Sequence, residues 1–135
     1  VKELYAEHVP GRAPLMTSLS MALLAARAAG VQILDGVYND VKNAEGFLAE
    51  CEQGRQMGFD GKTLIHPAQV AITNDAFAPT EAEIDLAKRQ IEAFEAAGKA
   101  GQGVAVVDGK IVENLHVATA QSILAKADAI AAMTE

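Results

Sequence analysis

The stretch Gly58–Gln69 has the residue types and spacing that most clearly favour chemistry. Two glycines bracket a tight turn, residues 62–65 predict a short buried strand, and Pro67 suits the first position of a helix. His66 lies between that strand and that helix. A titratable side chain at the carboxyl end of a strand is where α/β folds place their sites. We therefore expect His66 either to contact a ligand or to be a buried histidine that hydrogen-bonds a loop carbonyl.

A second group of polar residues belongs to the preceding predicted strand, 31–38, and to the loop after it. Asp35 is followed by Gly36 at the end of that strand, where it would either line a site or cap a turn. Asn39 and Asp40 come next, and they either cap the following helix or contact the ligand. Lys62 opens the later strand and is either a solvated lysine or a further site residue.

Helices and strands alternate in the part of the chain that must position these residues. The pattern predicts a helix over 17–29 ended by Gly30, a strand over 31–38, a helix over 41–57 ended by Gly58, a strand over 62–65 and a helix over 67–75. Two strands separated by a helix should be parallel, with a right-handed crossover. Two parallel strands alone leave open edges, so we expect further strands from an absent segment or a second chain.

The pattern changes after Pro79, which suggests two domains, 1–79 and 80–135. Thr80 and Glu83 form the spacing of a capping box, and the helix it opens should run to about residue 97. Asp108-Gly109 between two β-branched runs, 104–107 and 110–112, predicts a hairpin. A last helix is expected over 116–133.

Composition limits the classes of protein to which the chain can belong. Half of the 135 residues are hydrophobic, which excludes a disordered chain, and the net charge of −7 argues against binding nucleic acid or an anionic membrane. No apolar run reaches the about 18 residues of a membrane span. The single cysteine, Cys51, rules out an internal disulfide and favours the cytoplasm; we expect it to be a structural thiol.

Five stretches together resemble one family: residues 25–30, 34–40, 58–69, 74–79 and 107–113. The chain is similar to the C-terminal part of the citrate lyase β-subunit-like and malyl-CoA lyase family of CoA-ester lyases, in the HpcH/HpaI aldolase superfamily. This resemblance implies the last two strands and helices of a (β/α)8 TIM barrel, followed by a helix–β-hairpin–helix lid or oligomerisation segment.

The resemblance also implies a function for the full-length protein. It would be a Mg²⁺-dependent lyase that cleaves or forms a C–C bond in a 3-hydroxyacyl-CoA, such as citryl-, malyl- or citramalyl-CoA, through an enolate of the acyl-CoA. The Mg²⁺ ligands are expected upstream of this chain, so the chain alone should be inactive. The partners would be an acyl-CoA and further copies in a homotrimer or hexamer. The alternatives are a thioesterase acting on malyl-CoA-type esters and a non-catalytic module.

Glu113 is the residue to which the resemblance gives a catalytic role. Family members often carry a carboxylate, usually Asp, at this point of the lid, where it reaches a neighbouring subunit's site as acid or base. This chain has Glu, followed by Asn-Leu-His. The alternative is a solvated Glu after the hairpin, with Asn114 capping the last helix. The resemblance places Lys62 near the CoA side of the site. The arginines on predicted helices, Arg27, Arg55 and Arg89, are expected to lie on solvated faces.

Overall fold

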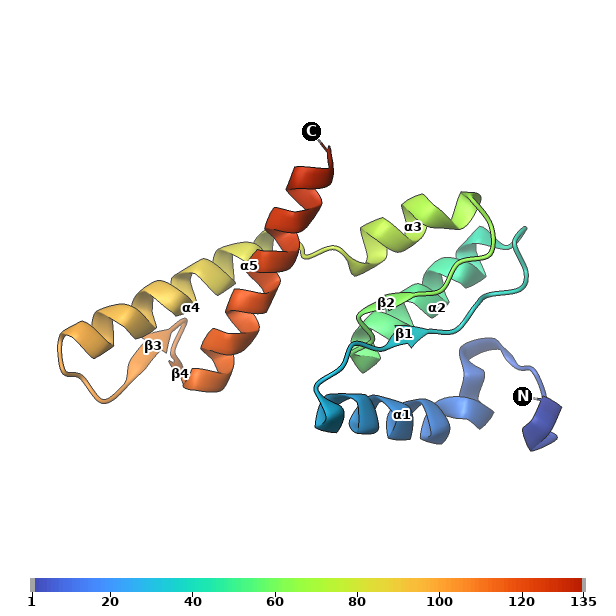
Figure 1. Ribbon diagram of the computed structural model, residues 1–135, viewed down its shortest axis with the longest axis horizontal. Coiled ribbons are helices and arrows are strands. Elements are labelled where there is room, and N and C mark those ends of the chain that lie inside the picture. Colours follow the sequence, from blue (N-terminus) through green and yellow to red (C-terminus); the bar gives the residue numbers. More distant parts are fainter. Residues whose placement is uncertain (1, 135) are drawn as a thin grey trace. The chain divides into compact units, whose positions relative to one another are not determined.

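The computed structural model describes residues 2–134 and divides into two compact units (Figure 1), one up to Phe77 and one from Ala78. The first unit has an α/β arrangement, with the elements η1 (Lys2–Leu4), η2 (Pro10–Leu15), α1 (Met16–Ala29), β1 (Leu34–Asp35), α2 (Ala44–Met57), β2 (Gly61–Lys62) and α3 (Ala68–Phe77). The second contains α4 (Glu81–Lys99), β3 (Ala105–Val107), β4 (Lys110–Val112) and α5 (Asn114–Thr134). The assignment of the two parts as barrel portion and lid stays a prediction.

The helix ends of the first unit follow the local signals in the sequence. Gly30 and Gly58 end α1 and α2 in the left-handed conformation, with φ of 67° and 104°, as predicted. Helix α2 lies against the two short strands, and α3 packs on α2 (Figure 1). The core between these elements is formed by apolar side chains of three helices and a loop: Leu23, Phe47, Cys51, Phe59 and Phe77.

The strands β1 and β2 are parallel, as predicted, but much shorter than expected. They pair only as Leu34 with Gly61 and Asp35 with Lys62, so the predicted ranges 31–38 and 62–65 are wrong in length. One backbone bond lies on each side of the paired residues, from the Asp60 N–H to the Ile33 carbonyl and from the Thr63 N–H to the Asp35 carbonyl, both at 3.0 Å, and side chains also bond the backbone on both sides. Before the strands, the Asp60 carboxylate accepts from the Ile33 N–H at 2.8 Å. After them, backbone groups of both loops bond to one side-chain amide, described below.

The start of α2 also differs from the prediction. The helix begins at Ala44, and the side chain of Asn43 caps it by accepting from the Gly46 N–H at 2.9 Å. Asn39 and Asp40 are therefore not its caps. Their carbonyl groups accept backbone N–H bonds from residues two and three positions later, which makes a turn before the helix. Both residues are exposed.

In the second unit α4 and α5 lie side by side, and the β3–β4 hairpin packs near one end of α4 (Figure 1). The predicted hairpin is confirmed, with Asp108 and Gly109 at φ of 51° and 74° in its turn. The helices are longer than predicted. Helix α4 continues through Gly98 to Lys99, and α5 begins at Asn114.

The predicted capping box of α4 is confirmed. The Thr80 hydroxyl accepts from the Glu83 N–H at 3.2 Å, and the Glu83 carboxylate accepts from the Thr80 N–H at 2.7 Å. Two N–H groups at the helix start are thereby satisfied.

Replacing Thr80 with alanine should lower the free energy of unfolding by about 1 kcal/mol, because one of these bonds is lost and the other loses its geometry. Urea denaturation of the full-length protein would measure this. Thr119→Ala is the matched control, since its hydroxyl only bonds the Leu115 carbonyl within an exposed helix turn. An equal loss of unfolding free energy in both variants would show that the capping box does not stabilise the protein more than an ordinary threonine hydroxyl does.

Among residues 2–134, the structure contains no helix with the length and apolar character needed to span a membrane.

Candidate functional site

The carboxyl ends of β1 and β2 bring two of the predicted site residues together. Asp35 and Lys62 are the last residues of their strands and are partners in the register. The Lys62 ammonium lies 3.0 Å from Asp35 Oδ2, and neither side chain has any exposed surface. Because the strands are parallel, the loops that follow both residues leave from the same edge, the usual place for a site in an α/β fold.

Two further charged residues, Arg12 and Glu50, join this pair and complete what we call the charge cluster. Arg12 Nη1 lies 2.7 and 2.8 Å from the two oxygens of Asp35. Lys62 Nζ lies 2.7 Å from Glu50 Oε1, and Arg12 Nε lies 3.6 Å from Glu50 Oε2. Two cations therefore face two carboxylates, and the cluster is neutral as a whole.

Arg12 reaches the cluster from a backbone turn before α1. It has a φ of 58° and follows Gly11 at 76°, so the chain bends sharply there. The Gln53 side chain holds this turn twice: its Oε1 accepts from Arg12 Nε at 2.9 Å, and its Nε2 donates to the Gly11 carbonyl at 2.8 Å. Arg12 Nη2 is buried and has no hydrogen-bond partner among the described residues.

The Asp35 carboxylate is satisfied by its neighbours in the protein. It accepts from Arg12, from Lys62 and from the Gly36 N–H at 2.8 Å. In this arrangement the carboxylate fixes the start of the loop after β1, and Lys62 fixes the end of β2 against α2 through Glu50. The predicted contact of Asp35 and Lys62 with substrate or CoA stays a prediction.

His66 lies in the loop after β2 and is exposed. Its Nδ1 accepts from the Ala68 N–H at 3.2 Å, and its carbonyl accepts from the Gln69 N–H at 3.0 Å. Of the two interpretations of this residue, the buried histidine bonded to a loop carbonyl is therefore wrong. His66 follows the last residue of β2 by four positions, on the loop that leaves the carboxyl end of that strand.

Gln69, on the first turn of α3, is buried and was not singled out by sequence reasoning. Its Oε1 accepts from the Ile65 N–H at 3.1 Å, and its Nε2 donates to the Tyr38 carbonyl at 3.0 Å. One side chain thus connects the loop after β1 with the loop after β2. The tyrosine ring packs against Phe47 with ring centroids 5.7 Å apart, which anchors the first loop on α2.

Glu113 lies in the second unit, directly between β4 and α5. It is exposed. Its N–H donates to His116 Nδ1 at 2.9 Å, and its carbonyl accepts from the N–H groups of His116 and Val117. Glu113 therefore occupies the capping position of α5, and the prediction that Asn114 caps this helix is wrong. His116 lies in the first turn, as expected.

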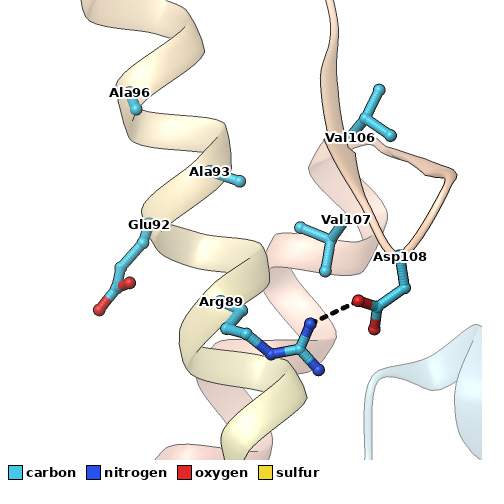
Figure 2. A pocket seen from close by; sticks show the side chains of 7 residues that line it. All are labelled: Arg89, Glu92, Ala93, Ala96, Val106, Val107 and Asp108. Atoms are coloured by element: carbon cyan, nitrogen blue, oxygen red, sulfur yellow. Dashed lines mark hydrogen bonds and ion pairs between the residues drawn. The ribbon is translucent and has the colours of Figure 1, made fainter.

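A shallow pocket of about 460 Å³ lies between α4 and the hairpin (Figure 2), lined by Arg89, Glu92, Ala93, Ala96, Val106, Val107 and Asp108. Arg89 points at the hairpin turn and bonds Asp108 at 2.7 Å as well as Asp85 at 2.8 Å. The guanidinium holds the pKa of Asp108 below its usual value. Arg89 is thus part of an ion pair that joins helix and hairpin. Arg27 is half-exposed and similarly bonds Asp60 and the Gly58 carbonyl.

Cys51 is fully buried in the core of the first unit, with Sγ 3.9 Å from Thr73 Oγ1. Burial raises the pKa of the thiol, which outweighs the opposing effect of Thr73. This buried position in the apolar core is what the interpretation as a structural thiol predicts. Within residues 2–134 no three His, Cys, Asp or Glu side chains form a group suited to a metal ion.

Gly54 is the residue of α2 that allows the charge cluster to lie against the helix. A Cβ there would lie 2.9 Å from Asp35 Oδ2 and 3.6 Å from the Phe77 ring. Gly54→Ala should therefore destabilise the protein by about 1–3 kcal/mol. Gly98→Ala, in open space near the end of α4, should instead stabilise it by up to about 1 kcal/mol. Thermal unfolding of both full-length variants measures this, and equal signs would contradict the packing described here.

Comparison with known proteins gives one family and several relatives. Residues 1–67 match the family model described as HpcH/HpaI aldolase/citrate lyase. The chain is 64% identical over 131 residues to the (3S)-malyl-CoA thioesterase of Cereibacter sphaeroides (strain ATCC 17025 / ATH 2.4.3), covering 97% of the chain and 46% of the relative. It is 41% identical over 128 residues to the citrate lyase subunit beta of Escherichia coli (strain K12), covering 95% and 42%.

A solved structure has a similar fold. The crystal structure of the protein CitE from Mycobacterium tuberculosis, in complex with magnesium, acetoacetate and coenzyme A, matches with a TM-score of 0.68 and 29% identity. The match covers 87% of this chain and 42% of that one. The chain therefore spans less than half the length of the relatives it matches.

Proposed function

This chain belongs to the HpcH/HpaI aldolase/citrate lyase family, and from that we propose that the full-length protein hydrolyses the thioester of a malyl-CoA-type ester. The observation that carries the proposal is the 64% identity, over 97% of the chain, to a protein named (3S)-malyl-CoA thioesterase. The family resemblance in the sequence favours the C–C lyase over the thioesterase, whereas this identity favours the thioesterase.

The lyase remains the second candidate, because the chain is also 41% identical to a citrate lyase subunit beta. The two reactions act on the same kind of substrate but break different bonds. In hydrolysis the oxygen of water bonds to the acyl carbon, the C–S bond breaks, and the CoA sulfur takes up a proton. In C–C cleavage the 3-hydroxyl loses its proton and becomes a carbonyl, the bond to the α-carbon breaks, and the α-carbon leaves as the enolate of the acyl-CoA and takes up a proton.

Both reactions need a group that accepts or donates a proton, and we propose Glu113 for this role. Its carboxylate is exposed at the junction of β4 and α5, where a short backbone cap fixes the residue but leaves the side chain accessible. Consistent with the lid hypothesis, it would act in a site completed by another subunit of a homo-oligomer. We further propose a cytoplasmic trimer or hexamer as the working form.

For the first unit we propose a portion of a (β/α)8 barrel that contributes the carboxyl-end loops to the binding of the CoA ester. Support comes from the parallel β1–β2 pair with α2 between the strands in sequence. The exposed residues Asn39, Asp40 and His66 lie on those loops and are the proposed ligand contacts. Asp35 and Lys62, which are buried in the charge cluster, would act by holding the two loops in place.

Magnesium and the CoA ester complete the proposal, since a related structure was solved with magnesium and coenzyme A. The residues of this chain do not fit a Mg²⁺ site. The carboxylates of Asp35 and Glu50 are already engaged by Arg12 and Lys62, and the described part of the chain offers no other suitable cluster. We propose that the residues that bind the ion lie in a part of the full-length protein outside this chain, corresponding to the part of the relatives that the chain does not cover.

The test is incubation of the full-length protein with malyl-CoA and separation of the products by chromatography. Hydrolysis predicts equal amounts of free CoA and malate. Formation of acetyl-CoA and glyoxylate would support the lyase instead. If neither pair appears while the protein is folded, both enzyme proposals fail and a non-catalytic module is favoured.

A further inference from the structure

We propose that Gln69 is the positioning residue that sets the spacing of the two ligand-binding loops, and so controls the affinity for the CoA ester. The proposal rests on the proposed function. Its starting point is that a polar side chain only 2% exposed bonds backbone groups of two different loops.

The two bonds fall directly before the proposed ligand contacts. Tyr38, whose carbonyl accepts from Gln69 Nε2 at 3.0 Å, immediately precedes Asn39. Ile65, whose N–H donates to Gln69 Oε1 at 3.1 Å, immediately precedes His66. A shift of this one amide would therefore move both groups of ligand contacts relative to each other.

The orientation of the amide is determined by its partners. Oε1 faces an N–H donor and Nε2 faces a carbonyl acceptor, so a flipped amide would break both bonds. The backbone of Gln69 is held as well: its N–H donates to the His66 carbonyl, and its carbonyl accepts from Thr73 Oγ1 at 2.8 Å. Gln69 is thus held in place on its own helix, as a residue that positions two loops must be.

The short strand pairing explains why a side chain is needed to hold the two loops together. The β1–β2 pairing ends at Asp35 and Lys62, and one backbone bond follows it, from the Thr63 N–H to the Asp35 carbonyl at 3.0 Å. The charge cluster secures the strand ends, and Gln69 secures the loops three residues further on, at Tyr38 and Ile65.

Two variants of the full-length protein separate the two bonds. Gln69→Glu keeps the acceptor for the Ile65 N–H but puts an oxygen opposite the Tyr38 carbonyl. Gln69→Met keeps the shape and removes both bonds. Phe77→Leu is the matched control, because Phe77 is buried on the same helix two turns later and takes no part in the two bonds of Gln69.

The measurements are kcat and KM with malyl-CoA and the hydrogen exchange of the Ile65 amide. We expect both Gln69 variants to lower kcat/KM roughly 10- to 100-fold, mainly through KM. Exchange at Ile65 should accelerate in Gln69→Met and stay slow in Gln69→Glu. Phe77→Leu should leave KM within about 2-fold of wild type, even if its melting temperature falls as far as that of the Gln69 variants.

A wild-type KM in both Gln69 variants, with exchange at Ile65 accelerated in Gln69→Met, would overturn the proposal, because the loops would then be uncoupled without consequence for binding. An equal rise of KM in Phe77→Leu would also overturn it, since the effect would be one of general packing. If wild-type protein neither binds nor converts malyl-CoA, the proposed function fails first, and this proposal falls with it.

Discussion

Replacing Asp35 with asparagine should lower the free energy of unfolding of the first unit by about 3–5 kcal/mol, because it leaves buried cations without their counter-charge. Asparagine has nearly the shape of aspartate, so packing is kept and the charge alone is removed. Arg12 and Lys62 would then share the single carboxylate of Glu50, which lies 3.6 Å from Arg12 and 2.7 Å from Lys62. Urea denaturation of the full-length protein, followed by circular dichroism, measures the loss.

Asp40→Asn is the matched control for this prediction. It makes the same change in the loop after the same strand, but on an exposed side chain, and should alter stability by less than about 0.5 kcal/mol. The double variant Asp35→Asn with Lys62→Met should cost less than the sum of the single variants, because each removes part of the same ion pair. An Asp35→Asn loss no greater than that of Asp40→Asn would show that the cluster is not a coupled buried network.

Replacing Glu113 with glutamine should reduce turnover of the full-length enzyme roughly 10²- to 10⁴-fold while leaving its folding unchanged. The amide cannot accept a proton at neutral pH, yet it has the same length. The side chain is exposed and the cap of α5 uses only its backbone, so stability should not depend on the carboxylate. Steady-state kinetics with malyl-CoA, beside thermal unfolding, separates the two effects.

Glu95→Gln, on an exposed position of α4, is the control for removing one negative charge from the second unit. It should leave turnover unchanged. Glu113→Asp should retain part of the activity, since the acid group is kept with one methylene fewer. Turnover of Glu113→Gln close to that of Glu95→Gln would exclude Glu113 as the acid or base and return it to the role of a solvated helix cap.

Features that depend on local chemistry could be predicted from the sequence. The glycines that end α1 and α2, the capping box of α4 and the Asp-Gly hairpin each depend on a few neighbouring residues, and all are present as expected. The parallel pairing of β1 and β2 also followed, because the helix between them dictates it.

The lengths of the strands could not be predicted, because they depend on side chains from elsewhere in the chain. β-Branched and apolar residues over 31–38 favour a long strand. In the structure, the Asp60 carboxylate and the Gln69 amide take backbone groups that a longer ladder would use. In the sequence, Asp60 has the features of an ordinary turn residue and Gln69 those of an ordinary residue at a helix start, so neither predicts these bonds.

The charge cluster was half visible from the sequence. Asp35 and Lys62 could be predicted as site residues from their positions in the two predicted strands. Arg12 could not, because it lies in a stretch without periodicity and takes a left-handed conformation unusual for arginine. The position of Glu50 in the cluster could have been predicted from its spacing along α2. It lies three residues after Phe47 and four before Gly54, on the same face as Cys51, so this carboxylate belongs to the buried side of α2.

The measurement that tests the central claim most directly is the rate of free-thiol release from malyl-CoA by the full-length protein, compared with acetyl-CoA at the same concentration. The two esters share CoA and the thioester and differ in the hydroxylated dicarboxylic acyl group. We predict rapid release of CoA from malyl-CoA and little or none from acetyl-CoA. Equal rates, or release from neither while the protein is folded, would contradict the proposal that the full-length protein hydrolyses malyl-CoA-type esters.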